Sequence, residues 1–91
     1  MARERFEVFF TGSVQGVGFR YTAKQVSRSY EVVGTVQNLP DRRVKLVVEG
    51  ETLTIESFIR QICESTHGHV RETEITRSPA TNAYTRFEII R

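Results

Sequence analysis

The middle of the chain carries two strand-like segments joined by a short polar connection. Residues 32–40 read VVGTVQNLP, and residues 43–50 read RVKLVVEG, with apolar residues at every second position of the latter. Pro40 and Asp41 are typical of a turn, because proline presets φ at the second turn position and aspartate tolerates the next one. The pattern predicts a β-hairpin. A central hairpin limits how the segments on either side of it can pack.

A helical pattern lies on each side of this hairpin. Apolar residues spaced by four, three and four predict a helix over residues 20–30. They are Phe19, Ala23, Val26 and Tyr30. A second apolar stripe predicts a helix over residues 51–65, with Gly68 free to adopt the left-handed conformation in which helices often end. Its members are Leu53, Ile55, Phe58, Ile59, Ile62 and Cys63.

Three further segments are expected to be strands, at residues 5–12, 70–77 and 83–90. The resulting order is β-α-β-β-α-β plus a short terminal strand. Two right-handed β-α-β units interlock in this order, which places both helices on one face of an antiparallel sheet. The sequence therefore predicts an α+β fold, a ferredoxin-like α/β sandwich. This architecture hosts many unrelated functions, so it decides none by itself.

Composition narrows the class of protein. A length of 91 residues predicts one domain over residues 1–91, and a net charge of +2 gives no indication of a nucleic-acid partner. No apolar run approaches the roughly 20 residues of a membrane helix, and residues 1–10 lack a signal-peptide core. The single cysteine is typical of a reducing compartment. We expect a cytoplasmic monomer.

The run GSVQGVGFRY, residues 12–21, raises a problem of charge. Arg20 would lie in the first turn of a helix, where the helix dipole disfavours a cation. A bound oxyanion reverses this, because helix amides, loop amides and a guanidinium can share it, and Gly16 and Gly18 allow close approach. The run matches neither the nucleotide-binding P-loop nor the dinucleotide-binding pattern. From the residues alone, a mobile connection with an exposed arginine remains an equal alternative.

Two blocks resemble a known family. The run GSVQGVGFR is similar to the signature loop of the acylphosphatases, and GTVQNLPD, residues 34–41, resembles that family's second motif. The resemblance covers essentially the whole chain. It implies that the phosphate is bound by Arg20 and the loop amides, and that Asn38 orients the attacking water. The implied phosphate-binding residues are Gln15, Gly16, Val17, Gly18, Phe19 and Arg20.

The implied reaction is hydrolysis of a small acyl phosphate to a carboxylate and inorganic phosphate. The carboxylate leaving group has a conjugate-acid pKa of about 4, so it departs without a general acid. The transition state is loose, so positioning and charge stabilisation supply most of the catalysis. This explains why no nucleophile, acid or base stands beside the loop. We expect no cofactor and no metal, because Arg20 and the loop amides would do the work of a cation.

Other readings remain to be weighed against this one. An idle anion- or nucleotide-binding module could keep the same loop for recognition alone. An RNA-binding module of this fold would need aromatic residues on its central strands, and RVKLVVEG has none. His67 and His69 lack a third metal ligand at a recognisable spacing, so they are interpreted as a solvated turn. Cys63 lies on an apolar stripe and is interpreted as a core residue.

The chain departs from the family pattern at two places. Arg42 follows Asp41 where the family often has glycine, so a non-glycine residue must take any positive φ that the turn requires. The nearby basic cluster, Arg42, Arg43 and Lys45, is interpreted as a solvated turn that could also steer anions. Thr35 replaces a large aromatic residue, which could alter the wall of the site.

Overall fold

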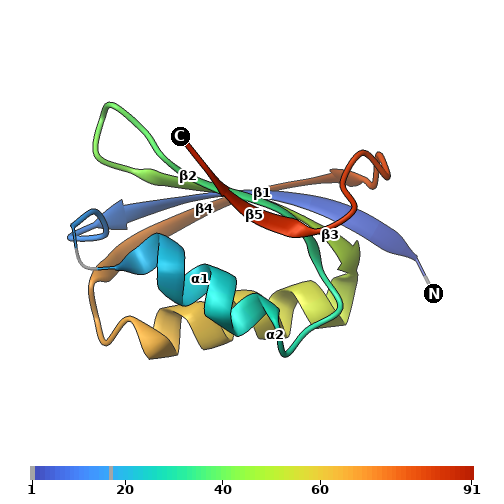
Figure 1. Ribbon diagram of the computed structural model, residues 1–91, viewed down its shortest axis with the longest axis horizontal. Coiled ribbons are helices and arrows are strands. Elements are labelled where there is room, and N and C mark those ends of the chain that lie inside the picture. Colours follow the sequence, from blue (N-terminus) through green and yellow to red (C-terminus); the bar gives the residue numbers. More distant parts are fainter. Residues whose placement is uncertain (1, 17) are drawn as a thin grey trace.

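The computed structural model describes residues 2–16 and 18–91, and it has two helices packed on one face of a five-stranded sheet (Figure 1). The chain order is β1 (Arg3–Gly12), α1 (Phe19–Ser27), β2 (Val33–Asn38), β3 (Val44–Glu51), α2 (Thr52–Ser65), β4 (Val70–Pro79) and β5 (Phe87–Ile90). The strands lie side by side in the order β4-β1-β3-β2-β5. This confirms the predicted ferredoxin-like α+β fold.

The strand pairing differs from the prediction at one edge of the sheet. β4, β1, β3 and β2 pair antiparallel, as expected, but β5 pairs parallel to β2. The sheet is therefore mixed. The reason is that β4 and β5 lie at opposite edges of the sheet, so the chain crosses its whole width before the terminal strand begins.

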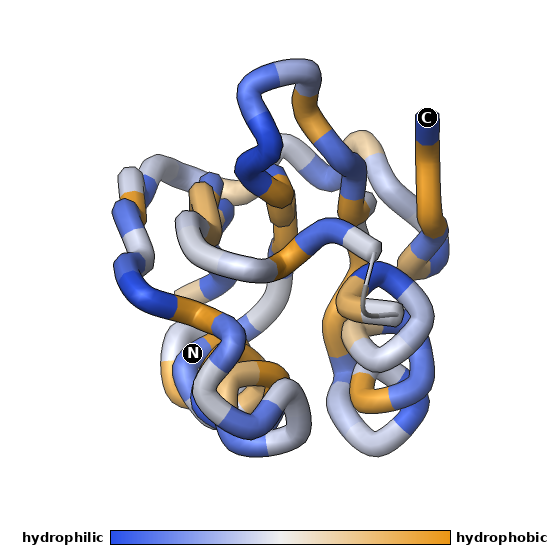
Figure 2. Tube along the Cα trace, turned by 90° about the vertical axis from the view of Figure 1, so that its left-hand side faces the viewer, coloured by the Kyte–Doolittle hydropathy of each residue, from blue (hydrophilic) through white to orange (hydrophobic). Residues whose placement is uncertain are grey.

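The hydrophobic core lies between the sheet and the helices. Alternate residues of the central strands point toward the helices, as the period of two predicts. In Figure 2 the hydrophobic stretches of the trace run along the strands and helices, whereas the projecting β2–β3 turn is hydrophilic. The core side chains with essentially no exposure include Val8, Phe10, Val36, Leu46, Val48, Ile55, Phe58 and Ile62.

α1 is shorter than the predicted helix over residues 20–30. It ends at Ser27, and the amides of Arg28, Ser29 and Tyr30 bond to carbonyls three residues back, as in turns. The Tyr30 side chain nevertheless packs on the core, with its ring 5.9 Å from that of Phe58. The prediction ran past the end of the helix because Tyr30 keeps the helical spacing and packs on the core although its backbone is no longer helical.

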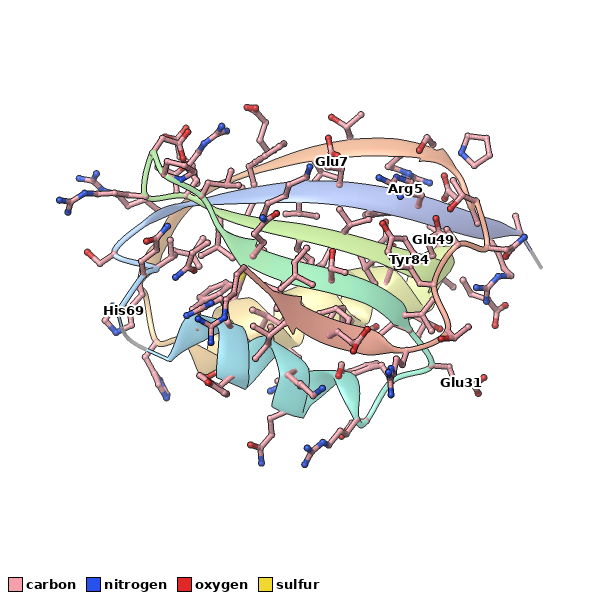
Figure 3. The ribbon with its side chains drawn as sticks, turned by 45° about the horizontal axis from the view of Figure 1, so that its top comes forward. Arg5, Glu7, Glu31, Glu49, His69 and Tyr84 are labelled. Carbon is pink, nitrogen blue, oxygen red and sulfur yellow. The ribbon has the colours of Figure 1, made fainter. Side chains whose placement is uncertain are left out.

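The terminal strand is also shorter than predicted, beginning at Phe87 rather than at residue 83. The preceding connection folds over the sheet face that the helices leave open. There Glu49 is fully buried and accepts hydrogen bonds from the Thr81 amide (3.0 Å), the Thr81 hydroxyl (2.7 Å) and the Asn82 amide (2.9 Å). Arg5 lies 3.7 Å from the same carboxylate. Figure 3 shows Arg5, Glu49 and Tyr84 gathered on this face.

Candidate active site

A small cavity lies where β1, β2 and α1 meet. Its volume is about 100 Å³, well below the roughly 300–1,000 Å³ of a pocket that encloses a drug-sized ligand. A cavity of this size suits a small ion better than a nucleotide. In Figure 1 the end of β1 and the start of α1 lie on the same side of the molecule as the β2–β3 turn. The lining residues are Val14, Gly16, Gly18, Phe19, Arg20, Tyr21 and Asn38.

The glycine loop is anchored on both sides of its glycines. Val14 is 1% exposed, and Phe19 is 2% exposed with its ring 4.9 Å from that of Phe10. Between these anchors, Gly16 and Gly18 have φ values of 81° and 76°. Only glycine takes this left-handed conformation without strain. Both glycines line the cavity, and the residues on either side of them are fixed in the core.

The first turn of α1 has no capping hydrogen bond and no acidic residue that an anion would have to displace. Gly18 is the N-cap residue and, having no side chain, makes no capping hydrogen bond, and the first turn contains no acidic residue. Arg20 lies in this turn and lines the cavity, and no carboxylate of the described residues lies within ion-pair distance of it. Amides and guanidinium are thus both free to meet an oxyanion.

Asn38, the last residue of β2, also lines the cavity. Its Oδ1 atom is buried and has no hydrogen-bond partner among the described residues. A buried acceptor left in this state costs about 1–3 kcal/mol. A water molecule or a ligand donor in the cavity would recover that free energy. This is the property required of a residue that holds a water next to a bound phosphate.

The Gln15 side chain, unlike the other described residues predicted to bind phosphate, does not line the cavity. Its side-chain amide donates to the carbonyls of Leu39 (2.8 Å) and Arg43 (2.9 Å), both in the β2–β3 turn, and it is not among the cavity-lining residues. The side chain is therefore engaged elsewhere, and only the backbone amide of Gln15 could serve a phosphate. Of the other predicted phosphate-binding residues, Gly16, Gly18, Phe19 and Arg20 line the cavity, and Val17 lies outside the described residues.

The β2–β3 turn does require a positive φ, and a residue other than glycine adopts it, as the sequence analysis expected for such a turn. Arg42 has a φ of 76°. Asp41 compensates by accepting hydrogen bonds from the backbone amide (3.1 Å) and the Nε (2.8 Å) of Arg43. Lys45 lies 3.6 Å from Glu7. Two of the three basic residues here are thus paired with carboxylates, which agrees with a solvated turn.

None of the remaining candidates lines the cavity. His67 and His69 are exposed in the α2–β4 turn, and Figure 3 labels His69. No group of three metal-binding side chains occurs in residues 2–16 and 18–91. Cys63 packs against the core, where burial raises the pKa of its thiol. Thr35 lies in mid-strand and does not line the cavity. Tyr21, which sequence reasoning missed, does line it; its place next to Arg20 was the available signal.

Fold and cavity together define a small α+β domain with an arginine-lined cavity, and comparison with known proteins gives the family. The acylphosphatase family model matches residues 6–89. Acylphosphatases of Lactobacillus johnsonii and Archaeoglobus fulgidus are 39% and 38% identical to this chain, over 88% and 91% of it and 90% and 93% of their own lengths. The crystal structure of the Bacillus subtilis acylphosphatase has a TM-score of 0.89 at 29% identity, over 97% of this chain and 99% of that one.

The chain therefore belongs to the acylphosphatase family, a family of enzymes. None of the helices in the described part of the chain is long and apolar enough to span a membrane.

Proposed function

We propose that this enzyme hydrolyses the carboxyl-phosphate bond of small acyl phosphates, with the phosphate held by Arg20 and the loop amides and the water oriented by Asn38. The observation that carries the proposal is the meeting of these groups at one small cavity. They come from segments far apart in the sequence, and each reaches the cavity without a competing partner among the described residues.

The charge balance supports an anionic ligand. Arg20, in the first helical turn of α1, lines the cavity together with two glycines of the loop, and no acidic side chain in the described part of the chain lines it. An empty site of this kind carries a net positive potential, from one full charge and from helix and loop amides. A phosphate group would interact favourably with the Arg20 charge, the helix amides and the loop amides at once. The planar guanidinium fits two of its oxygens.

The chemistry then follows from the leaving group. A water molecule that donates a hydrogen bond to the Asn38 Oδ1 atom attacks phosphorus, and a new P–O bond forms. The bond from phosphorus to the acyl oxygen breaks, and its electron pair leaves with the carboxylate. That carboxylate has a conjugate-acid pKa of about 4, so it needs no proton from the protein. The proton of the attacking water passes to a phosphoryl oxygen. No carboxylate, imidazole or thiol lines the cavity in the described residues, and this reaction requires none.

Turnover of acetyl phosphate by three proteins tests the proposal. We expect the wild type to be active in the presence of EDTA, since Arg20 and the amides do the work of a cation. Arg20→Ala should abolish phosphate binding and lower kcat/KM by about 10³-fold. Asn38→Ala should lower kcat by about 10²-fold and leave inhibition by inorganic phosphate unchanged.

Three results would contradict the proposal. An inactive wild type that still binds phosphate would favour the alternative, a non-catalytic anion- or nucleotide-binding module. Activity that survives Arg20→Ala would remove the role given to that residue. Dependence on added Mg²⁺ would remove the metal-free mechanism. The small cavity already argues against the nucleotide-binding form of the alternative.

The proposed enzyme acts as a cytoplasmic monomer. Its one cysteine is free, which suits a reducing compartment. Among the described residues, the exposed large apolar side chains are those of Tyr21, Leu53, Ile75 and Ile90, and they belong to four different elements. Light scattering of the purified protein tests this, and a stable dimer at micromolar concentration would contradict it.

A further inference from the structure

The Gln15 side chain joins two segments that carry different parts of the candidate site. Its Nε2 atom lies 2.8 Å from the Leu39 carbonyl oxygen and 2.9 Å from the Arg43 carbonyl oxygen. Both partners can only accept, so the nitrogen end of the amide must face them, and it has two protons to donate. The orientation of this amide is thus fixed by chemistry. We call this pair of hydrogen bonds the Gln15 strap.

The strap acts on the peptide segment next to Asn38. Leu39 directly follows Asn38, and the same two carbonyls already close the turn, through bonds from the Leu39 amide to Arg43 (2.8 Å) and from the Arg42 amide to Leu39 (3.1 Å). On the loop side, Gln15 lies between Val14 and Gly16, and both of these line the cavity. The strap therefore connects the phosphate loop to the end of β2 by a route outside the cavity.

Asn38 depends on such support because its own oxygen provides none. The Oδ1 atom has no hydrogen-bond partner among the described residues, so no bond from the protein to this atom sets the direction of its amide. The position of the backbone of residue 38 therefore contributes to that direction. That backbone is held on one side by the pairing of Asn38 with Val44 and on the other by the turn that Gln15 binds.

We propose that Gln15 is a positioning residue that fixes Asn38 relative to the phosphate loop, and that it acts on the reaction through Asn38. This inference rests on the proposed function. It gives the Gln15 side chain a role different from that of its backbone amide, which stays available to the phosphate. Loss of the strap should therefore reduce the rate of water attack and leave phosphate binding intact.

The test compares Gln15→Met with Gln37→Met. Methionine keeps the length of the side chain and the backbone amide but removes both donors. Gln37 is a matched control, because its side chain also donates to a backbone oxygen, that of Arg91 at 3.1 Å, but this bond is exposed and does not involve the β2–β3 turn. Using acetyl phosphate, we expect Gln15→Met to lower kcat by about 10- to 100-fold. KM and the inhibition constant of inorganic phosphate should not change, and Gln37→Met should match the wild type.

A double-mutant cycle separates positioning from general damage. If Gln15 acts through Asn38, then Gln15→Met should lower kcat by no more than about twofold in the Asn38→Ala background. The same loss in both backgrounds would overturn the proposal, as would weakened phosphate binding with unchanged kcat. An inactive wild type would instead refute the proposed function itself, so the two failures can be told apart.

Hydrogen exchange gives a readout that does not depend on activity. The amides of Leu39 and Arg42 should exchange several-fold faster in Gln15→Met, because their acceptor carbonyls lose a second donor that holds them in place. Unchanged exchange at both amides would overturn the proposal whatever the activity. If Gln15→Met does not fold, Gln15→Glu replaces it. Its kcat relative to the wild type should rise as the pH falls, since only the protonated carboxyl can donate to a carbonyl, and a flat ratio would overturn the proposal.

Discussion

Arg20 and Asn38 line the same cavity, one from the first turn of α1 and the other from the last residue of β2. The two side chains are therefore held by different elements of the fold. Positive charge and water orientation, the two requirements of the proposed reaction, can in consequence be disturbed separately. This separation makes the site accessible to simple mutational tests.

Arg20→Lys should show that the shape of the guanidinium matters as well as its charge. Lysine keeps the charge but loses the planar pair of donors that fits two phosphate oxygens. Phosphate at about 10 times its Kd should stabilise the wild type by about 1.4 kcal/mol, which is several degrees in Tm for a domain of this size. We expect this shift to be much smaller in Arg20→Lys, measured by thermal unfolding.

The matched control for Arg20→Lys is Arg28→Lys. Arg28 follows the opposite end of the same helix and does not line the cavity. It should keep the full shift in Tm. An Arg20→Lys protein that phosphate stabilises as strongly as the wild type would show that a point charge is enough.

Gly16→Ala and Gly18→Ala should lose activity through the backbone of the loop. An added Cβ meets no atom within 4 Å at either position, so the cost arises from the positive φ and amounts to about 1 kcal/mol. We expect unfolding in urea to show this loss in both variants and the assay to show a fall in kcat/KM. Gly68 has the same φ as Gly16, 81°, and is equally open, but it lies in the α2–β4 turn. Gly68→Ala should lose the same stability and keep its activity; a similar loss of activity would refute the loop argument.

Arg42→Gly should stabilise the protein. Arg42 has a φ of 76°, where an L-residue other than glycine costs about 1–2 kcal/mol. Glycine removes this strain but costs about 0.5–1 kcal/mol through the larger chain entropy of the unfolded state, so the net gain is between about 0 and 1.5 kcal/mol. The check is the urea midpoint at unchanged slope. A destabilised Arg42→Gly would mean that the arginine side chain makes a contribution larger than its backbone strain.

Glu49 should make stability depend on acid pH. Burial by itself would raise the pKa of this carboxyl, but hydrogen bonds from Thr81 and Asn82, together with the charge of Arg5, outweigh burial and lower the pKa below its ordinary value of 4.5. A lowered pKa in the folded state stabilises the protein above the unfolded-state value. That stability is lost as the pH falls below about 4.5 and through the folded-state pKa.

Glu49→Gln should therefore cost about 2 kcal/mol at pH 7 and flatten the fall in stability as the pH drops below about 4.5. Urea unfolding at several pH values measures both effects. Glu88→Gln is the control, because Glu88 is half exposed and its ion pair with Arg86, at 3.4 Å, is a surface pair worth little. Equal effects of the two substitutions would contradict the assignment to the buried carboxylate.

Much of the site followed from short stretches of sequence. The glycines at 16 and 18, the arginine after them and the asparagine at the end of the next strand carried both the anion-binding argument and the family resemblance. Arg20 and Asn38 line the same cavity, which agrees with that interpretation. The Gln15 side chain could not be foreseen, because its partners are two backbone carbonyls in another segment, and carbonyls look alike in every sequence.

Local patterning by itself determined the hairpin, the two amphipathic helices and the order of the elements, because period and turn chemistry are properties of neighbouring residues. Only the tertiary structure decided the features that depend on contacts between residues far apart in the sequence. The strand prediction over residues 83–90 was too long because the connection before Phe87 folds over the sheet to reach Glu49. The parallel pairing of β5 with β2, the burial of Glu49 and the Gln15 strap all have the same origin. Each forms only when segments far apart in the chain are brought together by the packing of a common core.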